Sequence, residues 1–394
     1  MSSSNQIGQS SLMAKLILPM TARSSTQSHR AATPLELLYD LVSVVAIAAA
    51  ATGLHHAVVE NHISDGLITF TMAFFSIWWA WMNFTWFASA YDNDDAIYRI
   101  AVLIMMSGSL CLAAGIADMF SDKSFFLSIV GYVIMRIGHV GLLVRAGLHN
   151  RDAYRSSLAF ALGVFLCQVT WILGFIFVPP EQIVVFFALM VLIEFAIPAT
   201  VSKFGTLPWH VGHIVERYGL LTIIVLGESL LSLTFAIQKI SKLPDNTASL
   251  AIHIVSGLVS MFALWWLYFG EQNFKALEKK STTFFWGYSH VIIFASIAAF
   301  GAGLAINLDF LEHHAKISAL VANASLTIPA AAFLMAIWLV HERYNTQGGP
   351  LLRHLFFPLI SLCILASSYL PMAIPAIALL LIVAVLLQSR THHA

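Results

Sequence analysis

Long apolar runs recur along this chain and constrain its fold more than any other feature. A helix needs about 20 mainly apolar residues to cross a bilayer. Runs of that kind fall near residues 34–53, 66–90, 96–117, 124–148, 157–178, 181–201, 208–238, 248–269, 283–308, 316–340, 351–369 and 371–389. The sequence therefore predicts an all-α fold, a polytopic transmembrane helical bundle of about twelve spans. The last two runs are barely separated, which leaves one re-entrant or broken element as the alternative there.

The composition excludes most other classes of protein. Asp, Glu, Lys and Arg make up only 10% of the 394 residues, whereas an average soluble domain carries roughly 25%. The 20 basic and 20 acidic residues balance, so the chain has no charge excess with which to bind nucleic acid. The 3 cysteines all lie in apolar runs, and their spacing predicts neither a disulfide framework nor a metal site. No cofactor is expected.

Charge and polarity divide the chain into a tail and a membrane domain. Residues 1–32 are rich in Ser, Gln and Thr, and their single apolar patch is too short for the core of a signal peptide. We expect a flexible, uncleaved tail over 1–32 and a transmembrane domain over 33–390. Most Lys and Arg residues of the short loops fall on the side of the N-terminus, which predicts that both termini are cytoplasmic.

Helices one to three and seven to nine resemble each other weakly. The second run carries Trp78-Trp79 and the eighth carries Trp265-Trp266, and both pairs are expected to belong to an aromatic belt at the membrane interface. The pattern predicts a parallel 6+6 repeat with halves 33–203 and 204–390. Such a repeat is typical of transporters whose site lies between the halves.

Ionisable residues inside the apolar runs carry most of the functional information, because each costs about 2.5–3.5 kcal/mol at the bilayer centre on insertion scales. Glu36 and Asp40 are spaced four apart and therefore share one helix face. The run over 208–238 is the richest, and Glu228 lies nearer its outer end while its other charged residues and its histidines cluster nearer the cytoplasm. The candidate proton or substrate site residues are Glu216, Glu228, Arg217, Asp40, Glu194, His213, His290, Glu36, Arg136 and Asn83.

The deep acids outnumber the deep arginines, so some carboxylates must be protonated, solvated or able to exchange a proton or cation. Each residue also has a structural interpretation. Glu36 can cap a helix, Asp40 can pair with Arg136, and Arg217 can bridge Glu194 and Asp40. His290 can serve in packing. A metal site at His213 and Glu216 is not expected, because no further ligands complete a shell.

Three strings resemble one family of membrane proteins. They are Pro34-Leu-Glu-Leu-Leu-Tyr-Asp40-Leu-Val, the string from His213 to Glu228-Ser229, and Tyr288-Ser-His290 with Gly301-Ala-Gly303. Together they are similar to the bacterial low-temperature-requirement A (LtrA) family, over roughly residues 32–390. The first string departs mildly, with Leu38-Tyr39 where the family favours an aromatic pair. The resemblance implies a multi-pass inner-membrane protein linked to growth in the cold, and no established activity.

These observations favour a proton-coupled secondary transporter of an unidentified small solute, rather than an enzyme. In this hypothesis Glu216 and Glu228 are the proton sites. The chain has no P-loop string, so ATP hydrolysis within it is excluded as the driving force. Its expected partners are the lipid bilayer, protons and the solute. The alternatives are a membrane sensor or structural protein involved in low-temperature adaptation, and an intramembrane lipid-modifying enzyme.

Overall fold

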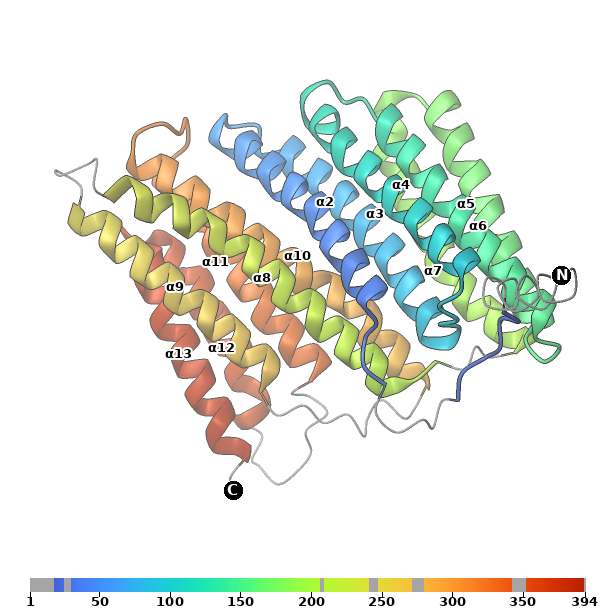
Figure 1. The fold of residues 1–394 in the computed structure, drawn as a ribbon. Helices are drawn as coiled ribbons and strands as arrows, with labels where there is room; N and C mark the ends of the chain where they lie inside the picture. The colour runs from blue at the N-terminus through green and yellow to red at the C-terminus, as the bar shows by residue number, and fades with distance from the viewer. Residues whose placement is uncertain are drawn as a thin grey trace, which may run out of the picture. The chain divides into compact units, whose positions relative to one another are not determined.

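The computed structural model describes residues 18–24, 30–205, 209–240, 247–270, 280–341 and 352–392. Within these ranges the chain forms α-helices joined by short connections, with no strand (Figure 1). The helices are α2 (Pro34–Val59), α3 (Ile63–Ala90), α4 (Ala96–Ser121), α5 (Phe126–His149), α6 (Tyr154–Phe177), α7 (Ile183–Val201), α8 (Val211–Ile240), α9 (Thr247–Phe269), α10 (Lys280–Leu311), α11 (Ala319–Val340), α12 (Leu352–Ala366) and α13 (Ala373–His392). The prediction of an all-helical, polytopic fold is confirmed.

Ten helical segments of the described chain are long and apolar enough to cross a membrane. They correspond to the first ten predicted runs. The last two runs form two shorter apolar helices, Leu355–Tyr369 and Ala373–Ser389. A 3-10 turn over Ser367–Tyr369 separates α12 from α13, so this region holds two helices rather than one.

The chain divides into two compact units, which do not coincide with the predicted halves. Unit 1 contains residues 1–46 and 75–220, and unit 2 contains residues 47–74 and 221–394. Each of the helices α2, α3 and α8 therefore contributes one segment to unit 1 and another segment to unit 2. The 6+6 repeat stays a prediction.

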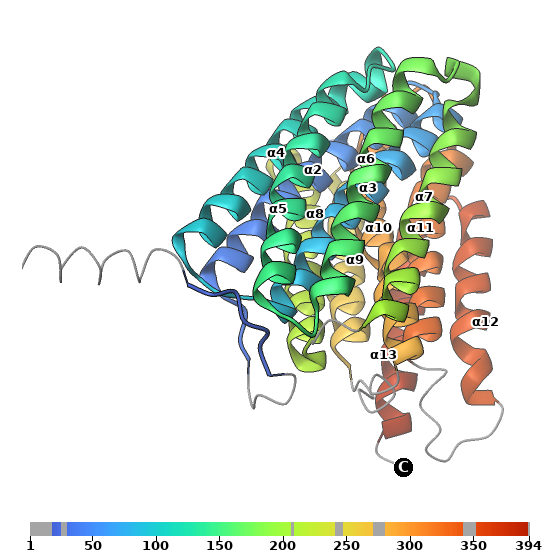
Figure 2. The same ribbon diagram turned by 90° about the vertical axis from the view of Figure 1, so that its right-hand side faces the viewer.

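In unit 1, α4 packs along α5, α5 along α6, and α6 along α7 (Figure 2). The contact between α4 and α5 is made close by glycine. A Cβ atom on Gly131 of α5 would lie 2.4 Å from the backbone nitrogen of Leu112, and one on Gly108 of α4 would lie 2.5 Å from the carbonyl oxygen of Gly131. The two backbones meet there with no side chain between them.

Unit 2 repeats this kind of contact in its own helices. Helix α10 packs along α11, α11 along α12, and α13 against α9. A Cβ atom on Gly303 of α10 would lie 2.2 Å from the carbonyl oxygen of Ser325 in α11. Phe294, Phe333 and Ile337 are fully buried in this unit.

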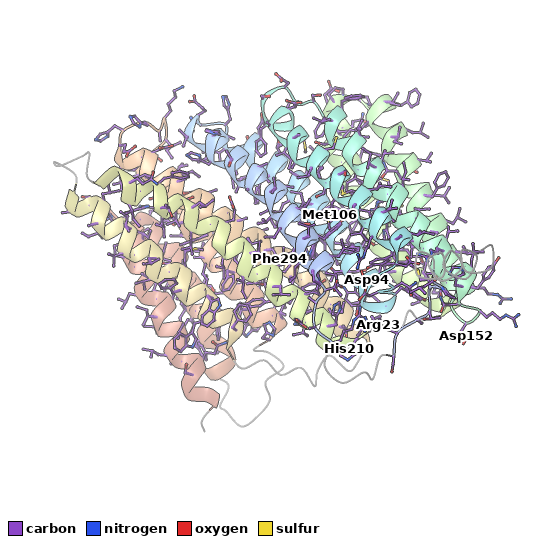
Figure 3. The ribbon with its side chains drawn as sticks, viewed as in Figure 1. Arg23, Asp94, Met106, Asp152, His210 and Phe294 are labelled. Atoms are coloured by element: carbon purple, nitrogen blue, oxygen red, sulfur yellow. The ribbon has the colours of Figure 1, made fainter. Side chains whose placement is uncertain are left out.

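Hydrogen bonds fix the described part of the N-terminal tail to the loops of unit 1. The amide of Met20 donates to Nδ1 of His149 at 2.9 Å, and Arg23 forms an ion pair with Asp92 at 2.9 Å. In Figure 3, Arg23, Asp94 and His210 lie at the same end of the unit 1 helices. The flexible tail predicted over 1–32 therefore includes residues with defined partners; residues 1–17 and 25–29 lie outside the described part.

Candidate functional site

The start of α2 shows why Glu36 is buried. Thr33 and Glu36 form a capping box, in which the hydroxyl of Thr33 accepts from the amide of Glu36 at 3.3 Å. In return, Oε2 of Glu36 accepts from the amide of Thr33 at 2.7 Å. This reciprocal pair satisfies backbone donors that the first turn leaves without intrahelical partners. Pro34 follows at the first helical position, where its missing N–H costs nothing. The capping interpretation of Glu36 is confirmed.

Glu36 has a second partner on α8. Its Oε1 atom lies 3.1 Å from Nε2 of His213, and both side chains are almost completely buried. His213 lies in the first turn of α8, and it forms an ion pair with Glu36 whenever its ring is protonated. A carboxylate and an imidazole in contact can share or pass a proton.

One turn further along both helices, Arg217 meets Asp40. Nη2 of Arg217 donates to Oδ1 of Asp40 at 2.6 Å, and the indole nitrogen of Trp81 donates to the same oxygen at 2.6 Å. The four-residue step from Glu36 to Asp40 matches the step from His213 to Arg217, so the two pairs stack along the facing sides of α2 and α8.

A separate ion pair lies among α3, α5, α6 and α7. Nη2 of Arg136 donates to Oε1 of Glu194 at 2.9 Å, and the indoles of Trp79 and Trp171 donate to the same carboxylate at 2.8 Å and 3.3 Å. The guanidinium of Arg136 also lies 4.9 Å from the centre of the Tyr132 ring, a cation–π distance. Glu194 thus has donors from three neighbouring helices.

These geometries correct two sequence-based expectations about partners. The basic partner of Asp40 is Arg217, not Arg136, and Arg217 does not bridge Glu194 and Asp40, since Glu194 pairs with Arg136. The i, i+4 spacing identified which acids share a face, but it carried no information on which arginine each acid would meet.

Two further predicted residues of unit 1 have weaker links to these pairs. Nδ2 of Asn83 donates to the carbonyl of Trp79 within its own helix at 2.7 Å. Glu216 is half-buried, and its Oε1 accepts from the amide of Ala32 at 3.2 Å. Glu216 therefore contacts the segment that leads into α2, close in sequence to the Glu36 cap.

Unit 2 contains the other two predicted residues, Glu228 and His290. Glu228 lines a cavity of about 120 Å³ formed by α2, α8 and α10, and its side chain is half-buried. Within the described part of the chain, Glu228 receives no hydrogen bond. The polar or titratable side chains around this cavity are Thr52, His55, Ser229 and Ser232.

The packing of α8 against α10 shapes this cavity. The hydroxyl of Ser229 donates to the carbonyl of Ile297 at 3.2 Å, and that of Ser232 donates to the carbonyl of Gly301 at 3.1 Å. A Cβ atom on Gly301 would lie 2.7 Å from Cβ of Ser229. Glycine at position 301 therefore allows the two helices to approach beside Glu228.

His290 lies in an aromatic cluster of unit 2. Its ring centre is 4.0 Å from that of Trp286, 5.8 Å from that of Tyr268 and 6.0 Å from that of His341. Nδ1 of His290 lies 2.7 Å from the carbonyl oxygen of Trp286. The packing interpretation of His290 therefore has direct support.

Sequence reasoning missed the tryptophans as functional partners. The sequence predicts an interfacial position for Trp79, but Trp79 and Trp81 are both 1% exposed and donate to buried carboxylates. Trp265 and Trp266 of α9 are instead 47% and 54% exposed, as a belt requires. The sequence held a hint that the tryptophans of α3 are buried. The second run also contains the polar residue Asn83, and buried acids need hydrogen-bond donors, which an indole can supply.

Together, the fold and these buried pairs define a multi-pass helical membrane protein with an internal charge network. Comparison with known proteins gives the family. The model of the bacterial low temperature requirement A protein (LtrA) family matches residues 31–388, nearly the whole chain. The protein belongs to this family, and the resemblance drawn from the three sequence strings is confirmed.

A search of curated proteins adds a relative without a known role. An uncharacterized protein of Rhizobium meliloti (strain 1021) is 24% identical over 272 residues, which cover 66% of this chain and 63% of the relative. The chain thus spans less than two thirds of that relative's length. No solved structure matches the chain significantly.

Proposed function

We propose that this protein is a proton-coupled secondary transporter of a small solute in the bacterial inner membrane, with both termini in the cytoplasm. The observation that carries the proposal is the placement of Glu228. Its carboxyl group lines a cavity in a membrane-spanning helix, and no described residue donates a hydrogen bond to it. A carboxylate at membrane depth without a fixed partner is costly unless it binds a proton or a cation. Reversible binding of that kind is what coupling requires.

The other deep acids differ from Glu228 in having fixed donors. Asp40 and Glu194 each accept from an arginine and from at least one indole. Carboxylates that accept several fixed hydrogen bonds of this type hold neighbouring helices in register. We therefore assign Asp40, Arg136 and Glu194 to the scaffold, and Glu228 to the exchanging site.

A second proton-exchanging group is proposed at the end of unit 1 where α2 and α8 begin. Glu36, His213 and Glu216 lie there, and the contact between Glu36 and His213 allows the protonation of one to depend on the other. Arg217, one turn from His213, pairs with Asp40 beside this group. A cationic or neutral solute fits this excess of carboxylates better than an anion.

A membrane sensor or structural protein is the second candidate, and the Asp40–Arg217 pair favours it. Both side chains are fully buried and bonded to each other, and such a pair can specify helix register. An intramembrane lipid-modifying enzyme has less support, because the buried acids found here have arginine and indole partners rather than a nucleophile. We therefore propose no catalytic residue.

Proton flux in proteoliposomes tests the proposal. Purified protein is reconstituted with a pH-sensitive dye inside, and pools of small solutes are added outside. We expect a solute-dependent pH change with the wild type that is lost in Glu228→Gln. The matched control is Glu181→Gln, at an exposed acid between α6 and α7, which should behave as the wild type.

Two outcomes contradict the proposal. Equal pH changes in the wild type and in Glu228→Gln would remove Glu228 from the coupling. Solute uptake that dissipates no proton gradient would replace proton coupling by facilitated diffusion.

A further inference from the structure

Three ligand-type side chains converge at the end of α10. Asp309, Glu312 and His314 each present one oxygen or nitrogen atom, and these atoms all lie within 4.8 Å of one another. The histidine nitrogen Nδ1 is 3.4 Å from a carboxylate oxygen of Glu312. All three residues belong to unit 2 and lie outside the charge network of unit 1.

The backbone after α10 explains this convergence. The helix ends at Leu311, and the chain then turns back so that the amide of His314 donates to the carbonyl of Asp309 at 2.8 Å. His313, between them, has a φ of 61°, a left-handed conformation that reverses the chain direction. The reversal returns His314 to the side of Asp309, five residues earlier.

A residue from a distant part of the sequence orients the first of these ligands. Nε2 of His55, near the end of α2, lies 2.7 Å from Oδ2 of Asp309 across a separation of 254 residues. This hydrogen bond holds the carboxylate of Asp309 in place. Carboxylates that bind metals are commonly held by such an outer hydrogen bond.

The set of atoms indicates which ligand would bind. Two carboxylate oxygens and one imidazole nitrogen suit borderline transition metals, whereas Ca²⁺ and Mg²⁺ prefer oxygen ligands alone. The bonds of such metals to these ligand types are about 2.0–2.2 Å, so small side-chain rotations would bring the three atoms onto one ion. Three protein ligands leave a further coordination position open for water or another group.

We infer that Asp309, Glu312 and His314 form a binding site for a divalent transition-metal ion such as Zn²⁺, with His55 as the positioning residue of Asp309. The inference does not depend on the proposed transport activity, because it concerns binding alone. It also assigns a role to His55 that the sequence did not suggest. His55 lines the cavity that contains Glu228, so the metal site adjoins that cavity within unit 2.

Zinc titration of the purified full-length protein, without a histidine tag, tests the inference. We expect one Zn²⁺ per chain, measured by calorimetry and by elemental analysis after gel filtration. His314→Ala should weaken this binding by at least about tenfold, since a direct ligand is lost. His314 is largely exposed, with 71% of its side chain accessible, so this variant should fold normally.

A neighbouring histidine supplies the matched control. His313→Asn removes an imidazole from the same turn, and asparagine tolerates the left-handed conformation, so Zn²⁺ affinity should remain at the wild-type value. His392 and His393 near the C-terminus are replaced by Ala in every protein compared. Visible absorption of bound Co²⁺ gives a second readout, which should change in Asp309→Asn.

The inference is overturned if Zn²⁺ binds His314→Ala and His313→Asn equally well. It is overturned equally if the wild type retains no Zn²⁺ and shows no Co²⁺ absorption. Saturation by Mg²⁺ or Ca²⁺ at the same affinity would contradict the assignment to a transition metal.

Discussion

Nη2 of Arg217 lies 2.6 Å from Oδ1 of Asp40, and neither side chain has any exposed surface. The pair joins α8 to α2 near the start of both helices. Two atoms of the arginine, Nε and Nη1, and Oδ2 of the aspartate form no hydrogen bond within the described part of the chain. Because an unsatisfied buried polar atom costs about 1–3 kcal/mol, this pair is not arranged for maximal stability.

Replacing one partner of this pair should lower the free energy of unfolding much more than replacing both. Asp40→Asn or Arg217→Met alone leaves an uncompensated buried charge or dipole, and we expect a loss of about 3–5 kcal/mol in the free energy of unfolding. The double variant should recover part of that loss. Thermal unfolding in detergent, followed by tryptophan fluorescence, measures the double-mutant cycle.

The control for this cycle is the exposed pair between Arg99 and Asp94, in which both side chains are 58% accessible. Arg99→Gln should leave the free energy of unfolding nearly unchanged. Strictly additive losses at Asp40 and Arg217 would show that the buried ion pair does not couple α2 to α8.

Glu36→Gln separates the two roles of Glu36. Glutamine also occurs at the third position of capping boxes, so the hydrogen bonds with Thr33 should survive, while the charge that faces His213 is lost. We expect nearly unchanged thermal stability together with an altered pH dependence of proton flux in proteoliposomes. Thr33→Val is the converse variant, and it should lower stability by about 1 kcal/mol with unchanged pH dependence. Identical effects of both variants would contradict this separation.

The sequence predicted the fold class well because length and hydrophobicity alone determine membrane-spanning helices. The runs near 96–117 and 248–269 correspond closely to α4 and α9, since polar loops bound them. The sequence also showed that Glu36 and Asp40 share a helix face, because helical periodicity depends only on the spacing of residues along the chain.

Partners across helices could not be predicted in the same way. The contact of Glu194 with Arg136 joins residues 58 positions apart, and that of His55 with Asp309 joins residues 254 positions apart. Only the packing of several helices fixes such pairs, and an apolar helix gives little information on its rotation. Trp81 shows why sequence alone does not identify such partners. An indole can face the membrane interface or a buried carboxylate, and the sequence around Trp81 is compatible with both positions.

Close contact between α4 and α5 depends on Gly131. Gly131→Ala would place a Cβ atom 2.4 Å from the backbone nitrogen of Leu112, so the helices must separate, and we expect a loss of stability of at least about 1–3 kcal/mol. Gly141→Ala, in the same helix, meets no atom within 4 Å and should be neutral or stabilising by up to about 1 kcal/mol. Thermal unfolding of both variants checks this contrast, and equal midpoints would refute the close α4–α5 packing.

The stability of the N-terminal attachment should fall in acid because of Asp95. Burial of Asp95 opposes its ionisation, but hydrogen bonds from Arg145 and from the amides of Tyr98 and Leu18 outweigh this effect and lower its pKa from 3.8 to about 2. A carboxylate whose pKa is lowered on folding stabilises the folded state fully above its unfolded pKa. This contribution, about 2 kcal/mol, should therefore be present above pH about 4 and disappear as the pH falls to about 2.

The difference in unfolding temperature between the wild type and Asp95→Asn measures this effect. We expect the difference to be largest above pH about 4 and to shrink steadily toward pH 2. Protonation removes the negative charge of Asp95 from the wild type, and the substitution has already removed it from the variant. Asp94→Asn is the matched control, since Asp94 is adjacent in sequence but pairs with Arg99 at the surface, where ion pairs contribute little. A difference for Asp95→Asn that stays constant from pH 6 to pH 2 would mean that the hydrogen bonds of Asp95, and not its charge, fix Leu18 and Arg145 in place.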